Sequence, residues 1–294
     1  MKIGIILNRV NFEEKQIIKS IENKGHKVVQ INNQDLILSL KKEKTDIIDK
    51  YGELDIIIQR SLSFTRGLYS TAILEMKGYK VINNFNCLRI CGDKLLTSLK
   101  LEENGIETPY TIVTFTKEAS IESIENKIKY PAIIKPIIGS WGRLIAKLDN
   151  YNSAEAIIED REVLGDVYHK IYYLQKYIGP DDRDKNEPTD IRVIQLGDDA
   201  IASMGRTSIG NEFRSNIAIG GKASKYNIDL ELKNLCKKIQ KVIGGDFIGI
   251  DLMKTKKGYV CIEVNGTPQF KGISEVNNFN IAEKFVDFIL EKYN

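Results

Sequence analysis

Hydrophobic and polar positions alternate in two different ways along this chain, and the change falls near residue 90. In the first part, short apolar runs alternate with amphipathic segments, in the order 2–7, 13–25, 26–31, 55–59, 67–78 and 79–84. Short apolar runs are typical of buried strands, and apolar residues three or four apart are typical of helices. This alternation of strand and helix predicts a parallel α/β sheet over roughly the first 85 residues.

Beyond that point the pattern predicts a mixture of helices and antiparallel strands. Helices are expected within 91–105, with a start at Asp93 and a stop at Gly105, and at 120–128, 153–164, 230–243 and 281–292. Strands are expected at 110–115, as a pair within 130–148, at 171–178, and in "IRVIQLG", "AIASMGRTS", "FIGIDLMKT" and "GYVCIEVNG". We therefore predict an N-terminal domain at 1–90, a central α+β lobe at 91–177 and a C-terminal α+β lobe at 178–294.

Composition narrows the class of protein. The chain has 294 residues, of which 42% are hydrophobic and 28% charged, as in ordinary globular proteins. Its formal net charge of +3 is too small for a dedicated nucleic-acid binder. The opening "MKIGIILNRV" holds an apolar run too short for a signal peptide or a membrane span. We expect a cytoplasmic protein with neither a nucleic acid nor a membrane as partner.

The four cysteines and two histidines make a zinc site or a histidine-based triad improbable. No two cysteines form a Cys-x-x-Cys pair, although Cys87 and Cys91 would share a face if their segment is helical. Reduced, mostly buried thiols are favoured over zinc ligands. Any metal is therefore expected to be held by oxygen atoms.

Three oxygen-bearing side chains are placed to meet near the end of the chain. Asp251 lies in "FIGIDLM", and "CIEVNG" puts Glu263 and Asn265 two residues apart, on one face of the next strand. If the two strands pair as a hairpin, the three side chains converge on that face. Carboxylate and amide oxygens next to phosphates are typical ligands of Mg²⁺. The alternative is that these acids form ordinary salt bridges with a nearby lysine.

Positive charge is available for a polyphosphate opposite those acids. A lysine inside an apolar strand such as "AIIKP" must find an anion or reach solvent, and a cation in the first turn of a helix opposes the helix dipole unless it serves a ligand. The candidate cations are Lys94, Lys135, Arg192, Arg206 and Arg214, and the neutral Asn216 follows Arg214 in the same polar loop. Cations facing metal-binding carboxylates are what phosphoryl transfer requires.

The turn "KPIIGSWGR", residues 135–143, holds the only tryptophan of the chain between two glycines. Gly139 and Gly142 allow the backbone to approach a phosphate closely. The turn matches neither a Walker A loop nor a dinucleotide fingerprint, and a plain hairpin turn is the alternative. We interpret it as a flap over a nucleotide. The strand "YLQKYIG" could present its backbone to an adenine edge.

The order of these motifs resembles the ATP-grasp ligases of the RimK type, over essentially the whole chain. The resemblance rests on "CGDK", "YPAIIKPIIGSWGRLIAK", "LQKYI", "TDIRVI", "FRSNIAIGG", "GIDLM" and "EVNG". Within that family it is similar to the branch that serves lysine and arginine biosynthesis. The resemblance implies an ATP-grasp fold, in which two α+β lobes clamp ATP, and an enzyme that joins a carboxylate to an amine through an acyl phosphate.

The resemblance also implies a role for each candidate residue. The ATP-binding set would be Lys94, Lys135, Gly139, Ser140, Trp141, Gly142, Arg143, Gln175, Lys176, Tyr177 and Ile178. Asp251, Glu263 and Asn265 would bind Mg²⁺, as two ions. Arg192, Arg206 and Asn216 would act at the acyl-phosphate end. Arg66, Arg214, Thr267 and Ile273 would contact the substrates. Lys176 stands where the family commonly has Glu, so its backbone is the expected ligand.

The implied substrates are an amino acid and a small acidic carrier protein, LysW-like, that ends in glutamate. Ile273 is smaller than the aromatic residue expected of glutamate enzymes, which favours α-aminoadipate; glutamate, or both amino acids, is the alternative. Two further alternatives are a RimK-like glutamate ligase acting on another protein or a cofactor, and a non-catalytic ATP-binding module. The complete set of candidate lysines and acids argues against the second. A homo-oligomer is expected from the family.

Overall fold

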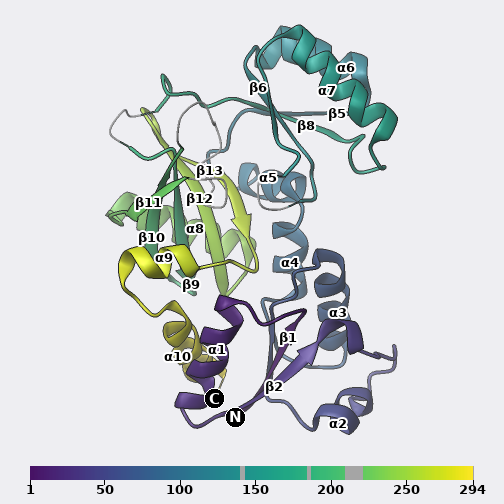
Figure 1. Cartoon of the computed structure of the whole chain (residues 1–294), viewed down its shortest axis with the longest axis vertical. Helices are drawn as coiled ribbons and strands as arrows, with labels where there is room; N and C mark the ends of the chain where they lie inside the picture. The colour runs from purple at the N-terminus through teal and green to yellow at the C-terminus, as the bar shows by residue number, and fades with distance from the viewer. Residues whose placement is uncertain (140–142, 184–186, 209–220, 294) are drawn as a thin grey trace.

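A computed structural model describes residues 1–139, 143–183, 187–208 and 221–293, and the statements below concern these residues. They form three sheets stacked along the long axis of the molecule (Figure 1). The N-terminal sheet has the order β2-β1-β3-β4, and all its pairings are parallel, which confirms the predicted parallel α/β domain. Its elements are β1 (Lys2–Leu7), α1 (Phe12–Asn23), β2 (Lys27–Asn32), η1 (Asn33–Asp35), α2 (Thr45–Tyr51), β3 (Ile56–Gln59), α3 (Phe64–Met76) and β4 (Val81–Ile82).

The second sheet, in the upper lobe of Figure 1, is antiparallel and has the order β5-β8-β6-β7. Two helical segments cover it and close a separate apolar core, in which Ile134, Leu148 and Ile158 have no exposed surface. The elements are β5 (Thr111–Thr114), α6 (Lys117–Ser123) with its π-helical continuation η2 (Ile124–Ile128), β6 (Ala132–Lys135), β7 (Ala146–Leu148), α7 (Tyr151–Leu164) and β8 (Tyr172–Lys176). Gly139, the last described residue after β6 before the gap at 140–142, lies beside α5, where its carbonyl oxygen accepts from Lys94 Nζ.

The third sheet is antiparallel throughout and has the order β11-β10-β9-β12-β13. Its strands are β9 (Asp190–Leu196), β10 (Asp199–Thr207), β11 (Lys222–Lys225), β12 (Phe247–Thr255) and β13 (Gly258–Asn265), and its associated helices are α4 (Phe85–Cys91), α5 (Lys94–Glu102), α8 (Leu230–Ile243), α9 (Lys271–Asn277) and α10 (Ile281–Tyr293). The predicted hairpin of β12 and β13 is confirmed, with Asp251 directly opposite Glu263.

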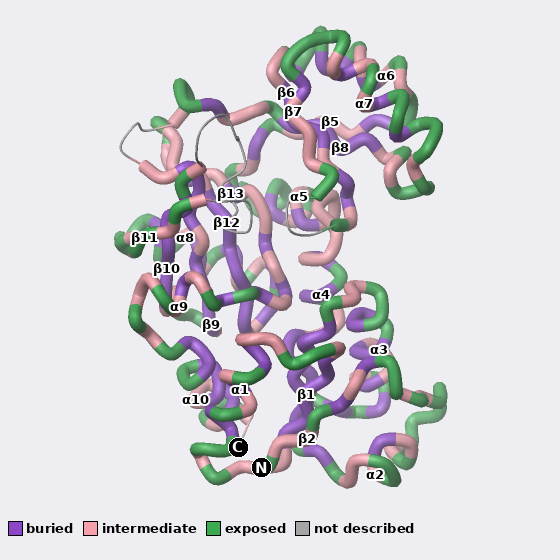
Figure 2. Tube along the Cα trace, in the orientation of Figure 1, coloured by how far each residue is buried: buried purple, intermediate pink, exposed green. Residues whose placement is uncertain are grey.

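One apolar core joins the N-terminal sheet to the third sheet. Residues of β1, β3 and α1 pack with residues of β9, β10 and α10 in a single cluster. Phe247 stands at its centre, stacked on Phe285 at 4.3 Å and edge-on to Phe270 at 6.0 Å between ring centroids. In Figure 2, buried residues follow the strands and the inner helix faces, while exposed residues follow the outer loops. Phe270 therefore packs between α1, through Phe12, and β12, through Phe247.

Three helices and one strand escaped prediction: α2, α4, α9 and β11. The sequence does not decide helix α4, because "FNCLRIC" spans only seven residues, although Asn84 caps it by accepting a hydrogen bond from the Cys87 N–H at 2.8 Å. The domain boundaries remain predictions. Helix α5, assigned by sequence to the central lobe, packs against α8 and β13 of the third sheet. No helix of the described segments has the length and apolar character to cross a membrane.

Candidate active site

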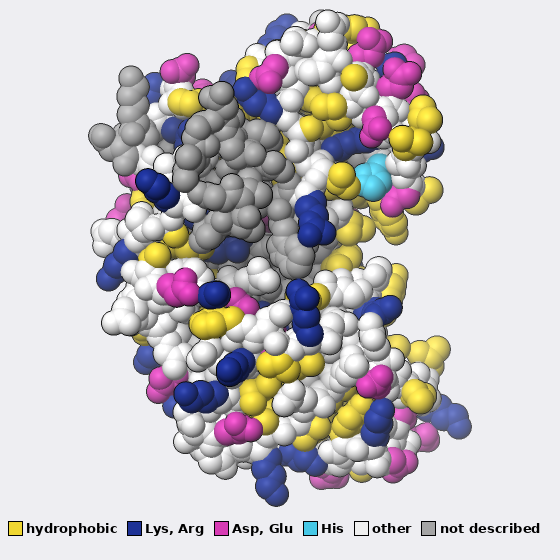
Figure 3. All heavy atoms as spheres, in the orientation of Figure 1, with side chains coloured by type: hydrophobic (Ala, Val, Ile, Leu, Met, Phe, Trp, Pro, Cys, Tyr) yellow, Lys and Arg dark blue, Asp and Glu magenta, His cyan; other side chains and the backbone are white. Residues whose placement is uncertain are grey.

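A cavity of about 1340 Å³ lies where the three sheets meet. Among its described lining residues are eleven lysines and arginines but only six acids. On the face shown in Figure 3, several Lys and Arg side chains lie at mid-height, between the upper lobe and the lower half of the molecule. An excess of cations around a deep cavity favours a polyanionic ligand.

Lys94 enters this cavity from the first turn of α5. Asp93 caps that helix by accepting hydrogen bonds from the backbone N–H groups of Leu95 and Leu96, at 2.8 and 3.1 Å. A side chain at Gly92 would overlap the ring of Phe64, so the "CGDK" turn needs its glycine. The Lys94 Nζ donates to the carbonyl oxygen of Gly139 at 2.6 Å and lies 3.3 Å from Glu263 Oε1. Lys94, a predicted phosphate ligand, therefore contacts both Gly139 of the predicted flap and the predicted metal ligand Glu263.

Lys135 ends β6 and points at the neighbouring strand β8. Its Nζ donates to Gln175 Oε1 at 2.6 Å, and the Gln175 amide nitrogen donates to the Tyr173 hydroxyl oxygen at 2.7 Å. The Tyr173 hydroxyl also lies 2.6 Å from Ser98 Oγ on α5, which links the upper lobe to the helix that carries Lys94. Burial lowers the pKa of Lys135 to about 8, because it penalises the charged form more than nearby acids favour it.

A network of two acids and two arginines, all buried except the partly exposed Arg192, crosses three strands of the third sheet. Arg192 on β9 donates to both oxygens of Asp251 on β12, at 2.6 and 2.5 Å. Arg206 on β10 lies 2.5 Å from Asp190 and 3.2 Å from Asp251. Burial opposes the ionisation of Asp251, but the two arginines outweigh it and lower its pKa to about 2. Burial dominates at Asp190 and raises its pKa to about 6.

Asp251, Glu263 and Asn265 carry oxygen atoms of the kind that Mg²⁺ prefers, although both oxygens of Asp251 already accept hydrogen bonds from Arg192. The Nδ2 atom of Asn265 is buried and has no hydrogen-bond partner among the described residues, and the Glu263 carboxylate has only Lys94 paired with its Oε1. Within those residues, no three His, Cys, Asp or Glu side chains are grouped to hold a metal. A cation would therefore need the Asn265 amide oxygen or ligand phosphates besides the two acids. The lysine salt bridge of the alternative interpretation is also present, at Glu263.

The other candidate residues divide into three groups. Those that line the cavity are Gly139, Arg143, Lys176, Tyr177, Ile178 and Thr267. Those that do not line it are Arg66, which is exposed on α3, Gln175, which is buried behind Lys135, and Ile273, which is fully buried in the apolar core. Ile273 therefore forms no direct wall of the cavity. Outside the described residues lie Ser140, Trp141, Gly142, Arg214 and Asn216.

Sequence reasoning missed Asp190, Tyr173 and Ser98 as parts of this site. Asp190 had a detectable signal, because it stands two residues before Arg192 and so shares its strand face. The signal is concealed because Asp190 ends the polar stretch "GPDDRDKNEPTD" at 179–190, which favours a loop. Tyr173 and Ser98 gave no signal, because an apolar strand and an amphipathic helix carry such residues routinely.

The arrangement of three sheets around a cation-rich cavity agrees with the expected ATP-grasp fold. Residues 91–289 match the RimK-like ATP-grasp domain, and residues 3–90 match the LysX preATP-grasp domain. The chain therefore belongs to the RimK-like ATP-grasp family, and it is a carboxylate–amine ligase. The predictions of fold and enzyme class are confirmed.

Two relatives and one solved structure illustrate the similarity. The α-aminoadipate–LysW ligase LysX of Sulfurisphaera tokodaii is 36% identical over 292 residues, covering 99% of each chain. The glutamate–LysW ligase ArgX of the same organism is 36% identical over 294 residues, covering 100% of this chain and 99% of ArgX. A RimK domain ATP-grasp protein of Sphaerobacter thermophilus shares the fold with a TM-score of 0.76 at 20% identity, covering 99% of this chain and 100% of that one. Family membership implies the use of ATP.

Proposed function

We propose that this enzyme joins the α-amino group of α-aminoadipate to the side-chain carboxylate of a C-terminal glutamate on a LysW-like carrier protein. The glutamate carboxylate attacks the γ-phosphorus of ATP, and ADP leaves. The amino nitrogen then attacks the acyl carbon of the acyl phosphate, inorganic phosphate leaves, and the nitrogen loses a proton. The product is an amide, and no side chain of the enzyme becomes covalently attached.

The observation that carries this proposal is the meeting of Lys94, Lys135 and Glu263 with the Arg192–Asp251 pair in one cavity. The two lysines supply positive charge for the ATP phosphates, and the arginines supply it for the acyl phosphate. Asp251 stays ionised at neutral pH because of its two arginines. These charged side chains are already in place where negative charge develops during phosphoryl transfer. The site therefore needs little rearrangement when the reaction occurs.

Asp251, Glu263 and Asn265 are the residues that would hold Mg²⁺, whose chemistry is to neutralise phosphate charge. Lys94 is bound to Glu263, so we infer that it turns from this carboxylate to a phosphate when ATP binds. Tyr177 and the backbone of 176–178 line the same cavity and are the candidates for the adenine contact.

Two amino acids compete for the second substrate role. Similarity to LysX over the whole chain supports α-aminoadipate, and equal identity to ArgX supports glutamate as the second candidate. Thr267 lines the cavity and is the residue we expect to contact the amino acid. A single methylene is worth only about 1–3 kcal/mol of discrimination, so use of both amino acids is compatible with this site.

The test is an assay of ADP release with ATP, Mg²⁺, a LysW-like carrier ending in glutamate, and either amino acid in parallel. We expect ADP only when all components are present, and a higher kcat/KM with α-aminoadipate. Preference for glutamate would move the assignment to the second candidate. If the enzyme turns over neither amino acid, the proposed function is wrong, although the chain still belongs to its family.

A further inference from the structure

The segment that follows the predicted metal ligands, residues 266–271, lies between two domains. Its side chains Thr267, Gln269 and Lys271 line the cavity, whereas Phe270 points the other way and has about 1% of its surface exposed. We call residues 266–271 the substrate loop. Phe270 packs edge-on against Phe12 of α1 and Phe247 of β12, with centroids 6.4 and 6.0 Å away.

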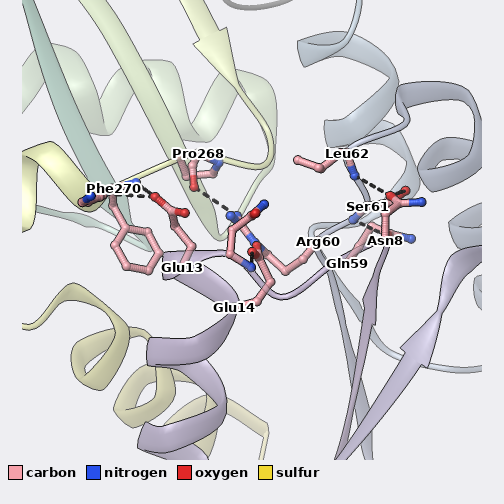
Figure 4. A network of polar contacts seen from close by, with 11 residues as sticks. Asn8, Glu13, Glu14, Gln59, Arg60, Ser61, Leu62, Pro268 and Phe270 are labelled. Carbon is pink, nitrogen blue, oxygen red and sulfur yellow. Dashed lines mark hydrogen bonds and ion pairs between the residues drawn. The ribbon is translucent and has the colours of Figure 1, made fainter. Parts of the chain in front are cut away.

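Three buried side chains of the N-terminal half hold successive points of this loop. The Asn83 Nδ2 donates to the carbonyl oxygen of Gly266 at 2.6 Å. The Arg60 Nη1 donates to the carbonyl oxygen of Pro268 at 3.0 Å. Glu13 Oε1 accepts from the backbone N–H groups of Phe270 and Lys271 at 3.0 and 3.1 Å. Figure 4 shows Arg60 and Glu13 reaching the loop from the N-terminal domain. We call Asn83, Arg60 and Glu13 the backbone clamp.

The clamp is itself rigidly supported. Arg60 Nε donates to Glu14 Oε1 at 3.0 Å, and Glu14 Oε2 accepts from the Asn11 N–H at 3.1 Å. Asn83 uses its carbonyl oxygen as well, accepting from the N–H groups of Asp246 and Phe247 at 2.8 and 3.0 Å. Each clamp residue has 6% or less of its surface exposed. Charged side chains are rarely this buried without partners, and these have them.

Every contact from the clamp to the loop is made to the backbone. The loop's own side chains at 267, 269 and 271 are therefore left to face the cavity. A displacement of about 1 Å at a substrate contact can change a rate on the order of 10²-fold, even when its cause lies far from the reacting atoms. A clamp that fixes the loop backbone would therefore fix the position of those three side chains.

We propose that Glu13, Arg60 and Asn83 are positioning residues for amino-acid recognition: the N-terminal domain sets the selectivity of the cavity by holding the backbone of residues 266–271. This rests on the proposed function, since it names where that function recognises its amino acid. Every contact of the clamp with the loop is made to the loop backbone, although Glu13 and Arg60 also line the cavity, which Asn83 does not. The effect of the clamp falls on the amino-acid substrate and not on ATP, whose predicted ligands lie on other elements.

The test compares Glu13→Ala with Glu13→Gln and Arg60→Met with Arg60→Lys. The Gln variant keeps an oxygen that accepts from both N–H groups, and the Lys variant keeps a positive charge beside Glu14. The matched control is Lys77→Met. The Lys77 ammonium is equally buried and donates to backbone carbonyl oxygens of Lys41 and Glu43 at 2.7 and 2.8 Å, but it lies outside the cavity lining. Its loss costs stability without moving the loop.

We expect Glu13→Ala and Arg60→Met to raise the KM for the amino acid on the order of tenfold and to change the ratio of kcat/KM for α-aminoadipate and glutamate. The KM for ATP should stay within about twofold. Glu13→Gln should largely restore both values. Hydrogen exchange, which needs no turnover, should show faster exchange at the N–H groups of Phe270 and Lys271 in Glu13→Ala only.

The outcomes separate this proposal from the proposed function. If the wild type turns over but the clamp variants match Lys77→Met in amino-acid KM and selectivity ratio, the positioning role is overturned. Unchanged hydrogen exchange in Glu13→Ala would overturn it as well. If the wild type turns over neither amino acid, the proposed function fails first, and the selectivity role fails with it even where exchange has increased.

Discussion

Lys94 and Glu263 form an ion pair, with 3.3 Å between Nζ and Oε1, although one is a predicted phosphate ligand and the other a predicted Mg²⁺ ligand. The pair joins the start of α5 to strand β13 across the cavity. In this pair each charge neutralises the other. Binding of ATP with Mg²⁺ would give both groups new partners of opposite charge, so the pair is a natural point at which ligand binding reorganises the site.

Glu263→Gln should lower kcat/KM on the order of 10²-fold and raise the Mg²⁺ concentration needed for half-maximal rate, because a ligand charge is lost. Steady-state assays over a Mg²⁺ series measure both. The control is Glu231→Gln, which removes a glutamate that pairs with Lys254 at 2.8 Å outside the cavity lining. Equal kinetics for the two variants would remove Glu263 from the metal site.

Lys135 predicts a pH dependence of ATP binding. Its pKa of about 8 lies below the ordinary value of 10.5, so above pH 8 the folded protein loses this proton before the unfolded chain does. Between pH 8 and 10.5 the unfolded state binds more protons, and this group's contribution to folding stability therefore rises with pH. Phosphate affinity moves the opposite way, because the neutral amine no longer attracts an anion. The ATP KM should rise about tenfold from pH 7 to 9.

The control for this prediction is Lys135→Arg, since a guanidinium stays charged throughout that range. Titration of ATP itself affects both proteins equally. The variant's ATP KM should lack the additional rise seen in the wild type. A parallel rise in both proteins would show that Lys135 does not cause it.

The Tyr173 hydroxyl connects Ser98 of α5 to Gln175 of β8, so Tyr173→Phe should loosen the joint between the upper lobe and the helix of Lys94. We expect a loss of about 1 kcal/mol in the free energy of unfolding, measured in urea, and weaker ATP binding. Tyr172→Phe is the matched control, because the neighbouring hydroxyl makes no hydrogen bond within the described chain. The idea fails if both variants lose the same stability and affinity.

Arg206→Met should destabilise the fold by about 3 kcal/mol, because Asp190 and Asp251 would both lose a shared buried cation. Urea unfolding at pH 7 measures this. A double-mutant cycle with Asp190→Asn should give a coupling free energy of at least about 1 kcal/mol. Additive effects of the two substitutions would mean that the Arg206–Asp190 pair contributes no interaction of its own.

The sequence predicted the structure correctly where a local pattern determines the position of a side chain or the start of a helix. Two-residue periodicity placed Glu263 and Asn265 on one face, and the predicted hairpin brought Asp251 opposite Glu263. The cap at Asp93 fixed the start of the helix that carries Lys94. These features depend on strand alternation and helix capping, which operate over a few residues.

The sequence was uninformative where the contacts are long-range. Glu13 lies 257 positions from Phe270, and Arg60 lies 208 from Pro268, so neither partner can be inferred without the topology. Acids in the first turn of a helix are usually explained by the helix dipole, which concealed Glu13. Ile273 is the opposite case. The sequence suggested that it contacts the substrate, but its side chain lies fully within the apolar core.

The most direct test of the central claim is the intact mass of a LysW-like carrier after incubation with the enzyme, ATP, Mg²⁺ and α-aminoadipate. The account predicts that the carrier gains the mass of one α-aminoadipate less one water, and that removal of its C-terminal glutamate abolishes the gain. Release of ADP with no change in carrier mass, or a gain that survives removal of that glutamate, would contradict it.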